Sequence, residues 1–231
     1  TNFGNGYPER NIQTGGFSYK YDKCDMHSNP EAIAAQETYL RDLVKHTNPY
    51  TGLAYKDDPS IVGFEINNEP CHSGTKEEVK AYINRMLKSM SKAGNRKPVF
   101  YNVSHNGYVA EAYYETTVQG TTYQWYPIGL VSGQTQQGNF LPYVDRYDIP
   151  FAGKVKEFNK KARMIYEFDP ADIMYSYMYP AMVRTFRTAG FQWITQFAYD
   201  PIDLAFANTE YQTHFLNLAY TPNKAISMKI A

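Results

Sequence analysis

The alternation of strand-like and helix-like segments constrains the fold of this chain more than any other feature. Short apolar runs typical of buried strands occur at residues 61–67, 98–103, 121–126, 163–168 and 191–198. Helical spacing or helix start signals mark the segments at 30–47, 75–92, 154–161, 173–188 and 209–218. Strands that alternate with helices usually pair in parallel through crossover helices. The sequence therefore predicts an α/β fold with five parallel strands.

Local signals set the ends of several predicted helices. Asn29 and Pro30 form a start signal for the helix at 30–47. Thr75 and Glu78 match a capping box, in which the side chains of the N-cap residue and of the third helical residue cap each other's backbone N–H. Gly94 is expected to end that second helix, and Gly190 to end the helix at 173–188.

Composition and charge exclude several classes of protein. Lys and Arg number 23, as do Asp and Glu, so there is no electrostatic reason to expect a nucleic acid or an anionic membrane as partner. No stretch approaches the ~20 apolar residues of a membrane span. Thr1 in place of Met indicates that upstream sequence is missing. Cys24 and Cys71 match neither a disulfide framework nor a zinc-ligand spacing, so they are expected to be two thiols rather than a bridge.

Aromatic residues are unusually abundant. They make up 16% of the chain and include 22 Tyr, with clusters at 123–126 and 175–179. Most of them are expected to fill the core. The clusters exceed what packing requires, and an aromatic ring with a polar tip suits a ligand that has apolar faces and wet edges, such as a sugar. Trp125 is therefore a candidate sugar contact.

Two glutamates are the leading candidates for catalysis. Glu69 follows the first predicted strand, and Glu167 lies at the end of the fourth. The carboxyl ends of parallel strands meet at one edge, where barrel enzymes place their catalytic groups. Cleavage of a glycosidic bond needs two carboxyl groups, one to protonate the leaving oxygen and one to attack or to activate water. Asn68 would offer its amide to the 2-hydroxyl of the sugar.

Each of these residues also has a structural interpretation. Asn-Glu-Pro at 68–70 can be a polar turn, with Glu69 hydrogen-bonded to the following helix. The segment 167–170 can be a turn with solvent-exposed acids. Glu65 lies on the same face of the predicted strand as Glu69 and is an alternative candidate for the catalytic acid. Its position inside the strand favours a buried ion pair instead.

The segments 51–61 and 65–70, which read TGLAYKDDPSI and EINNEP, closely resemble glycoside hydrolase family 5, notably its endo-β-mannanase-like members. The resemblance implies a (β/α)8 TIM barrel and a retaining glycosidase mechanism. It implies that Glu69, at the end of strand four, is the acid/base and that Glu167, at the end of strand seven, is the nucleophile. Residues 1–231 would form a single segment of the catalytic barrel that contains only strands four to eight.

Further residues can be compared with the family pattern. Tyr126 matches a Tyr that hydrogen-bonds the nucleophile, while Gln124 stands where the family typically has His, and Asp169 stands in place of Gly. An amide cannot titrate, so Gln124 changes how the acid/base is tuned. Strand eight of the family usually supplies a Trp beneath the sugar. Trp193 would be that residue, placed two positions earlier than in the family, or else a residue of the buried core. Trp193 and Thr195 are expected to lie on the same face of the strand.

Other polar residues complete the set of candidates. His72, His105 and Asn102 would lie in or beside loops that line a subsite, although a lone loop His is more often solvated. Asp200 and Asp203 could bind sugar hydroxyls or calcium. The sequence has no cluster with metal-ligand spacing, no glycine-rich phosphate loop and no nucleophile elbow. We therefore expect neither a cofactor nor a metal.

The sequence thus predicts retaining hydrolysis of a β-linked polysaccharide or oligosaccharide, such as a mannan or glucan, through a glycosyl-enzyme intermediate. The alternatives are a non-catalytic glycan-binding barrel and a transglycosylase. Because strands one to three of the barrel have no counterpart, we expect the chain to need the missing N-terminal half. The habits of the family suggest a secreted or periplasmic location.

Overall fold

A computed structural model describes residues 20–71, 73–104, 109–128, 138–170, 176–203 and 216–231. Within these residues, five strands form one sheet whose order follows the chain: β1 (Phe64–Glu65), β2 (Val99–Ser104), β3 (Gly120–Trp125), β4 (Ala162–Phe168) and β5 (Trp193–Gln196). β1 pairs with β2 in parallel, and β4 pairs with β5 in parallel. The predicted α/β fold with five strands is confirmed.

The chain divides into two compact units. The first unit comprises residues 1–122 and 151–162, and the second comprises residues 123–150 and 163–231. The described helices of the first unit are η2 (Lys23–His27), α2 (Pro30–Lys45), α3 (Lys76–Lys92), α4 (Ala110–Tyr114) and η3 (Phe158–Lys160). Those of the second unit are α5 (Leu141–Val144), α6 (Tyr179–Thr188) and α7 (Pro222–Ile230).

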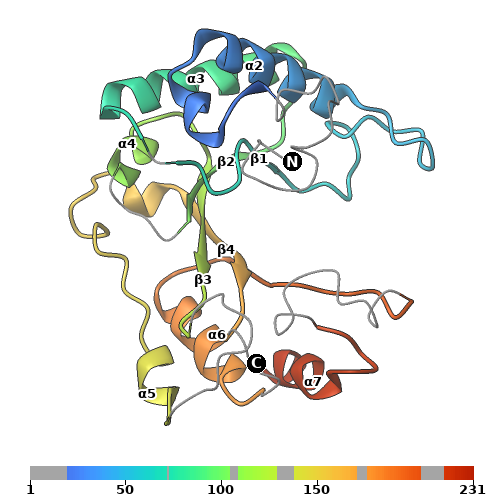
Figure 1. Cartoon of the computed structure of the whole chain (residues 1–231), viewed down its shortest axis with the longest axis vertical. Helices are drawn as coiled ribbons and strands as arrows, with labels where there is room; N and C mark the ends of the chain where they lie inside the picture. The colour runs from blue at the N-terminus through green and yellow to red at the C-terminus, as the bar shows by residue number, and fades with distance from the viewer. Residues whose placement is uncertain (1–19, 72, 105–108, 129–137, 171–175, 204–215) are drawn as a thin grey trace. The chain divides into compact units, whose positions relative to one another are not determined.

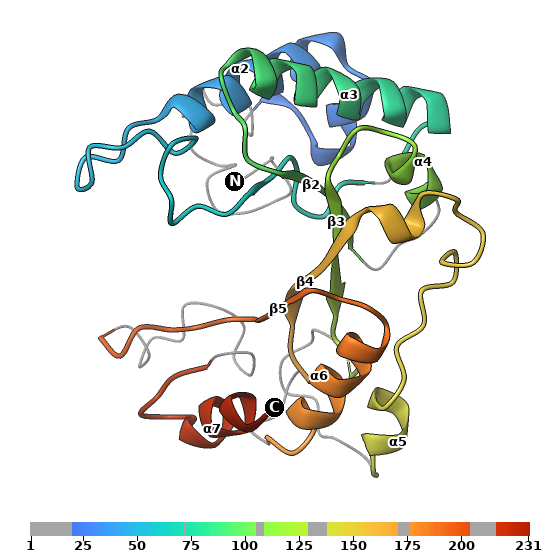
Figure 2. The same cartoon turned by 180° about the vertical axis from the view of Figure 1, so that it is seen from behind.

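In the first unit, α2 and α3 lie side by side (Figures 1 and 2). The side chain of Asn29 caps α2 by accepting hydrogen bonds from the backbone N–H of residues 31 and 32. Thr75 and Glu78 form the predicted capping box of α3. Buried residues recur every three or four positions along α3 and form one face of the helix. From this face, the Tyr82 hydroxyl donates a hydrogen bond to the Gln36 side chain of α2 at 2.5 Å. Gly94 ends α3 with a φ of 93°.

Two segments of the first unit differ from their predictions. The strand expected at 61–67 is confined to β1, because the backbone of residues 58–61 forms a turn and that of Glu69 is left-handed, with a φ of 45°. The helix expected at 154–161 is only the 3-10 turn η3. Backbone bonds from residue 154 to 151 and from 158 to 155 span three residues each, and the buried rings of Phe151 and Phe158 pack together.

In the second unit, α6 contacts both α5 and α7. Phe186 of α6 is fully buried against Phe168 of β4, with ring centroids 5.2 Å apart. The predicted helix 173–188 is observed from Tyr179, and Gly190 ends it with a φ of 84°. Most of the helix predicted at 209–218 lies outside the described residues. The helix α7 was not predicted, although Pro222 is a helix start signal.

The expectation for the cysteines is wrong, because Cys24 and Cys71 form a disulfide. Their Cα atoms lie 5.1 Å apart, within the range for a bridge, although 47 residues separate them in sequence. Spacing alone could not reveal this pairing, because it depends on η2 folding against the segment that follows β1. The bridge ties these two segments of the first unit together.

Candidate active site

A polar network occupies the end of β1 and β2 in the first unit. The Glu65 carboxylate accepts hydrogen bonds from the hydroxyl of Thr122 and from Asn102 Nδ2, the latter at 3.5 Å. Asn102 is fully buried, and its Nδ2 also donates to the Thr122 hydroxyl at 2.8 Å. These hydrogen bonds hold Glu65 in the strand, where the sequence had suggested an ion pair.

The same network reaches Glu69. The backbone N–H of Glu69 donates to Asn102 Oδ1 at 3.2 Å, so Asn102 supports the candidate acid/base directly. The Glu69 side chain remains 35% exposed, and its carboxylate pairs with Lys23 Nζ at 3.7 Å. The structural interpretation of the turn required Glu69 to bond to the helix that follows. The partner that the structure describes is instead Lys23 of η2.

The two asparagines before Glu69 have different environments. Asn67 is buried, close to the Tyr82 hydroxyl of α3. Asn68 is exposed, as its proposed contact with a sugar hydroxyl requires.

In the second unit, Glu167 is held by Tyr126. The Tyr126 hydroxyl donates a hydrogen bond to Glu167 Oε1. Burial raises the pKa of Tyr126 far above its ordinary value, and the charge of Glu167 and the hydrogen bond to it raise that pKa further. The phenol therefore stays protonated and acts as a donor to the carboxylate, an arrangement that favours the ionised form of an acid.

An aromatic residue that the sequence did not single out contacts Tyr126. Phe197 directly follows β5, and its ring meets that of Tyr126 edge to face, with centroids 6.1 Å apart. The peptide bond between Phe197 and Ala198 is cis. Phe197 is thus the aromatic residue at the end of β5 that contacts Tyr126, the hydrogen-bond donor to Glu167.

Trp193 lies elsewhere on β5. In the register of the two strands, Trp193 lies opposite Met164 near the start of β4, whereas Gln196 lies opposite Phe168 at the end of β4. Its side chain is 52% exposed, so the interpretation as a buried core residue is wrong. Its indole N–H donates to the Thr195 hydroxyl at 2.6 Å, which confirms that the two residues share a face.

Gln124 and Trp125 have packing partners of their own. Gln124 is buried and accepts a hydrogen bond from the Tyr166 hydroxyl at 2.5 Å. Trp125 packs edge to face against Tyr147 and Phe186, with centroids 5.0 and 5.6 Å away, and thus contacts α6. These contacts give both side chains a structural role, and their contact with a sugar stays a prediction. His72 and His105 lie outside the described residues.

Asp169, two residues beyond Glu167, is fully buried. It pairs with Lys224 of α7 at 3.4 Å, and Lys224 is fully buried too. The Tyr179 hydroxyl lies 3.3 Å from both carboxylate oxygens of Asp169. Burial lowers the pKa of Lys224, and the charge of Asp169 opposes that shift. Asp169 thus ties the end of β4 to α6 and α7.

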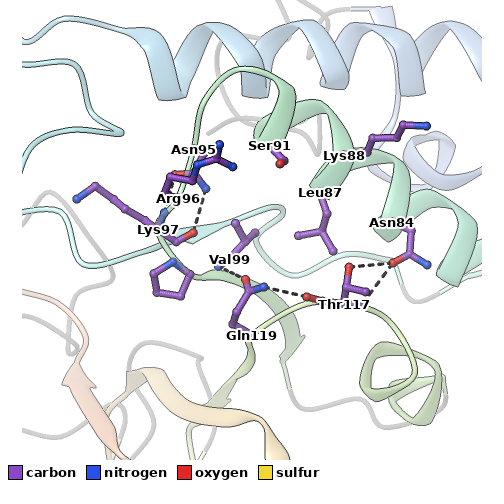
Figure 3. A pocket seen from close by; sticks show the side chains of 11 residues that line it. Asn84, Leu87, Lys88, Ser91, Asn95, Arg96, Lys97, Val99, Thr117 and Gln119 are labelled. Atoms are coloured by element: carbon purple, nitrogen blue, oxygen red, sulfur yellow. Dashed lines mark hydrogen bonds between the residues drawn. The ribbon is translucent and has the colours of Figure 1, made fainter.

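A cavity of about 550 Å³ in the first unit lies away from these residues. It is lined by the C-terminal half of α3 and by residues 95–99, 117 and 119 (Figure 3), at the point where β2 and β3 begin. The backbone N–H of Thr117 donates a hydrogen bond to Asn84 Oδ1, and the side-chain oxygen of Gln119 accepts one from the backbone N–H of Val99 (Figure 3). Barrel enzymes place their catalytic groups at the opposite ends of the strands, so this cavity is not the candidate site.

The described part of the chain shows neither a group of three or more His, Cys, Asp and Glu side chains that could hold a metal, nor a helix with the length and hydropathy to cross a membrane. The structure thus adds no metal or membrane feature to the two glutamate sites.

No family model matches the chain. Over 64 residues, 27% of this chain and 16% of the relative, the sequence is 31% identical to mannan endo-1,4-β-mannosidase 3 of Arabidopsis thaliana. Among solved structures, the endo-1,4-β-mannanase of Rhizomucor miehei matches with a TM-score of 0.59 at 17% identity, over 90% of this chain and 64% of that one. The hyperthermostable endo-1,4-β-D-mannanase of Thermotoga petrophila matches with a TM-score of 0.61 at 16% identity, over 89% and 66%.

The fold is thus that of the TIM-barrel glycosidases, of which this chain contains a part with five parallel strands. Within that class, the resemblance is to glycoside hydrolase family 5. A mannosidase of this family from Rhizomucor miehei matches at a TM-score of 0.59 and 14% identity, over 93% of this chain and 63% of that one. The chain spans less than two thirds of the length of each of these structures.

Sequence reasoning missed three residues: Lys23, which pairs with Glu69, Lys224, which pairs with Asp169, and Phe197, which contacts Tyr126. Lys23 gave no signal, because a single Lys near a chain end is usually solvated. Lys224 lies 55 residues from its partner Asp169. Phe197 was overlooked in favour of the nearby Trp, although it lies near the end of the predicted strand at 191–198 and could have been found by its position.

Proposed function

We propose that the protein is a retaining glycoside hydrolase, with Glu167 as nucleophile and Glu69 as general acid/base. The observation that carries this proposal is the hydrogen bond from the protonated Tyr126 to Glu167. A carboxylate that must attack an anomeric carbon has to be ionised and correctly aimed, and a phenol that can only donate serves both needs.

In the first step, Glu69 protonates the oxygen of the leaving sugar while Glu167 attacks the anomeric carbon. The glycosidic bond breaks, and a covalent ester to Glu167 forms through a transition state that resembles an oxocarbenium ion. In the second step, Glu69 takes a proton from water, and the water displaces Glu167. The configuration is retained, and the mechanism requires the two carboxyl groups to lie ~5–5.5 Å apart.

A β-1,4-linked mannan is the substrate that we propose. The printed names of the Arabidopsis relative and of the matched structures support it, since they describe mannanases and mannosidases. The exposed Asn68 and the ring of Phe197 are the side chains that we expect to contact the sugar. The disulfide supports a location outside the cytoplasm, because such bonds persist in oxidising compartments.

The proposal is tested with the full-length protein, because this chain spans only part of the matched structures. Glu167→Ala and Glu69→Gln are each compared with the wild type on mannan oligosaccharides and on an activated aryl β-mannoside. Both variants are expected to lose oligosaccharide hydrolysis. Azide should restore turnover of the aryl glycoside by Glu167→Ala and give a product of inverted configuration, because azide then attacks from the face that Glu167 occupied.

Glu77→Gln and Glu77→Ala serve as matched controls, since Glu77 is 80% exposed at the start of α3. Unchanged rates in both glutamate variants would contradict the proposal. The second candidate function, a glycan-binding barrel without catalysis, is favoured by Gln124, which replaces a titratable His and is engaged by Tyr166. It predicts binding of mannan oligosaccharides by calorimetry with no product from the wild type.

A further inference from the structure

The disulfide lies next to the candidate acid/base. Cys71 follows Glu69 by two residues, and its partner Cys24 follows Lys23, whose ammonium pairs with the Glu69 carboxylate at 3.7 Å. One short segment, η2, thus makes a covalent bond and an ion pair with the loop that carries Glu69. The Lys23 side chain is only 17% exposed, so it is held against the protein instead of extending into solvent.

The segment η2 is itself firmly anchored. Met26 is fully buried and packs against Ala32 of α2. His27 is also buried, its Nε2 lies 2.6 Å from the Tyr101 hydroxyl of β2, and its ring meets that of Tyr82 of α3 edge to face. The disulfide therefore links the Glu69 loop to an element that is fixed to both helices and to the sheet.

Two consecutive residues of β2 consequently fix Glu69 from two directions. Asn102 binds the backbone N–H of Glu69 directly. Tyr101 holds His27, and through η2 and the disulfide it holds the chain two residues beyond Glu69. This second connection matters because Glu69 has a left-handed backbone, which neighbouring structure must maintain in a residue other than glycine.

We propose that the Cys24–Cys71 disulfide and Lys23 are positioning groups for Glu69, and that reducing the disulfide selectively weakens its acid/base step. This inference rests on the proposed function. Reduction by a dithiol such as dithiothreitol converts the bridge to two thiols and the reductant to its cyclic disulfide, so two electrons and two protons pass to the protein. The loop then loses its covalent link to η2, and the Lys23–Glu69 ion pair loses the constraint that holds it.

The experiment measures how kcat/KM depends on the leaving group of the substrate. A poor leaving group, such as a sugar, needs protonation by Glu69, whereas dinitrophenolate leaves without it. The value of kcat/KM reports the first irreversible step, which is attack by Glu167. Misplacing Glu69 should therefore lower kcat/KM for a mannan oligosaccharide and spare kcat/KM for a dinitrophenyl β-mannoside. General loss of structure would lower both equally.

The experiment measures both kcat/KM values for the full-length protein before and after dithiothreitol treatment, with circular dichroism as a check on folding. We expect the ratio of the two values to shift by about tenfold or more, because misplacing a catalytic group by ~1 Å costs up to about 100-fold. Cys24→Ser with Cys71→Ser should reproduce the shift and abolish its dependence on the reductant. Lys23→Met should give a smaller shift in the same direction, and the exposed Lys92→Met should give none.

An unchanged ratio after complete reduction, or an equal loss with both substrates, would overturn the inference and leave the proposed function standing. If the oxidised wild type cleaves neither substrate, the proposed function fails and the inference falls with it. If the double Ser variant does not fold, the wild type with and without dithiothreitol still decides the question.

Discussion

The Tyr126 hydroxyl donates a hydrogen bond to Glu167, which lies on the strand after the one that Tyr126 follows. This contact within the second unit gives Glu167 a fixed direction and a donor that stays protonated. On the proposed mechanism, the hydrogen bond from Tyr126 weakens when Glu167 becomes an ester, because the ester oxygen carries less negative charge. The hydrogen bond strengthens again when the carboxylate is released.

Replacing Tyr126 by Phe should lower kcat by about 10- to 100-fold. A hydrogen bond to a charged group contributes about 1.5–3 kcal/mol, and each 1.36 kcal/mol changes a rate tenfold. Steady-state kinetics on an aryl β-mannoside checks this. Tyr143→Phe is the matched control, because Tyr143 is 57% exposed. Equal rates for Tyr126→Phe and the wild type would mean that the contact has no part in catalysis.

Phe197, which follows β5, should matter more for catalysis than Trp193 of β5. Phe197→Ala removes the ring that packs against Tyr126, whereas Trp193 lies near the start of the strand. We expect kcat/KM to fall at least tenfold more in Phe197→Ala than in Trp193→Ala, because loss of the ring frees Tyr126 to move. The reverse order, measured with the same oligosaccharide, would assign the sugar platform to Trp193.

The buried pair of Asp169 and Lys224 should dominate the stability of the second unit. Lys224→Met leaves the carboxylate of Asp169 buried without its cation, which costs about 3–5 kcal/mol of unfolding free energy. Urea unfolding followed by circular dichroism measures this loss. Adding Asp169→Asn should recover part of it, and the exposed Lys229→Met should change stability little. A change below about 0.5 kcal/mol in Lys224→Met, the range of ordinary surface substitutions, would contradict the account.

Stability should fall as the pH drops below the ordinary pKa of histidine. Burial lowers the pKa of His27 from 6.5 to about 4, so between these values the unfolded chain binds more protons than the folded one. The contribution of neutral His27 is complete above about pH 6.5 and is lost as the pH falls to about 4, a loss of about 3 kcal/mol.

Urea unfolding of the wild type at several pH values between 7 and 4 measures this slope. His27→Gln should flatten it, whatever the absolute stability of that variant. His46 is exposed, so His46→Gln should keep the wild-type slope. A wild-type slope that persists in His27→Gln would show that another group is responsible.

Local sequence signals predicted the elements that local chemistry determines. The capping box at Thr75, the helix end at Gly94 and the apolar runs of the strands all depend on residues close together in the chain. The contact between Tyr126 and Glu167 was expected as well, but from the resemblance to the family and not from the residues alone.

Contacts between distant segments could not be predicted in this way. The disulfide joins residues 47 apart, and the pair of Asp169 and Lys224 joins residues 55 apart, so each depends on the folded arrangement of its unit. The length of β1 was overestimated for a similar reason. An apolar run permits a strand, but the turn before β1 and the left-handed Glu69 after it decide how much of the run pairs.

The central claim is that Glu167 forms a covalent bond with the sugar while Glu69 does not. It is tested most directly by treating the full-length protein with an activated 2-deoxy-2-fluoro-β-mannoside, whose intermediate hydrolyses slowly because fluorine disfavours the oxocarbenium-like transition state. Mass spectrometry of the digested protein should find one fluorosugar, on the peptide that contains Glu167. A label on Glu69 or another residue, or turnover of the natural glycan with inversion and no label, would contradict the account.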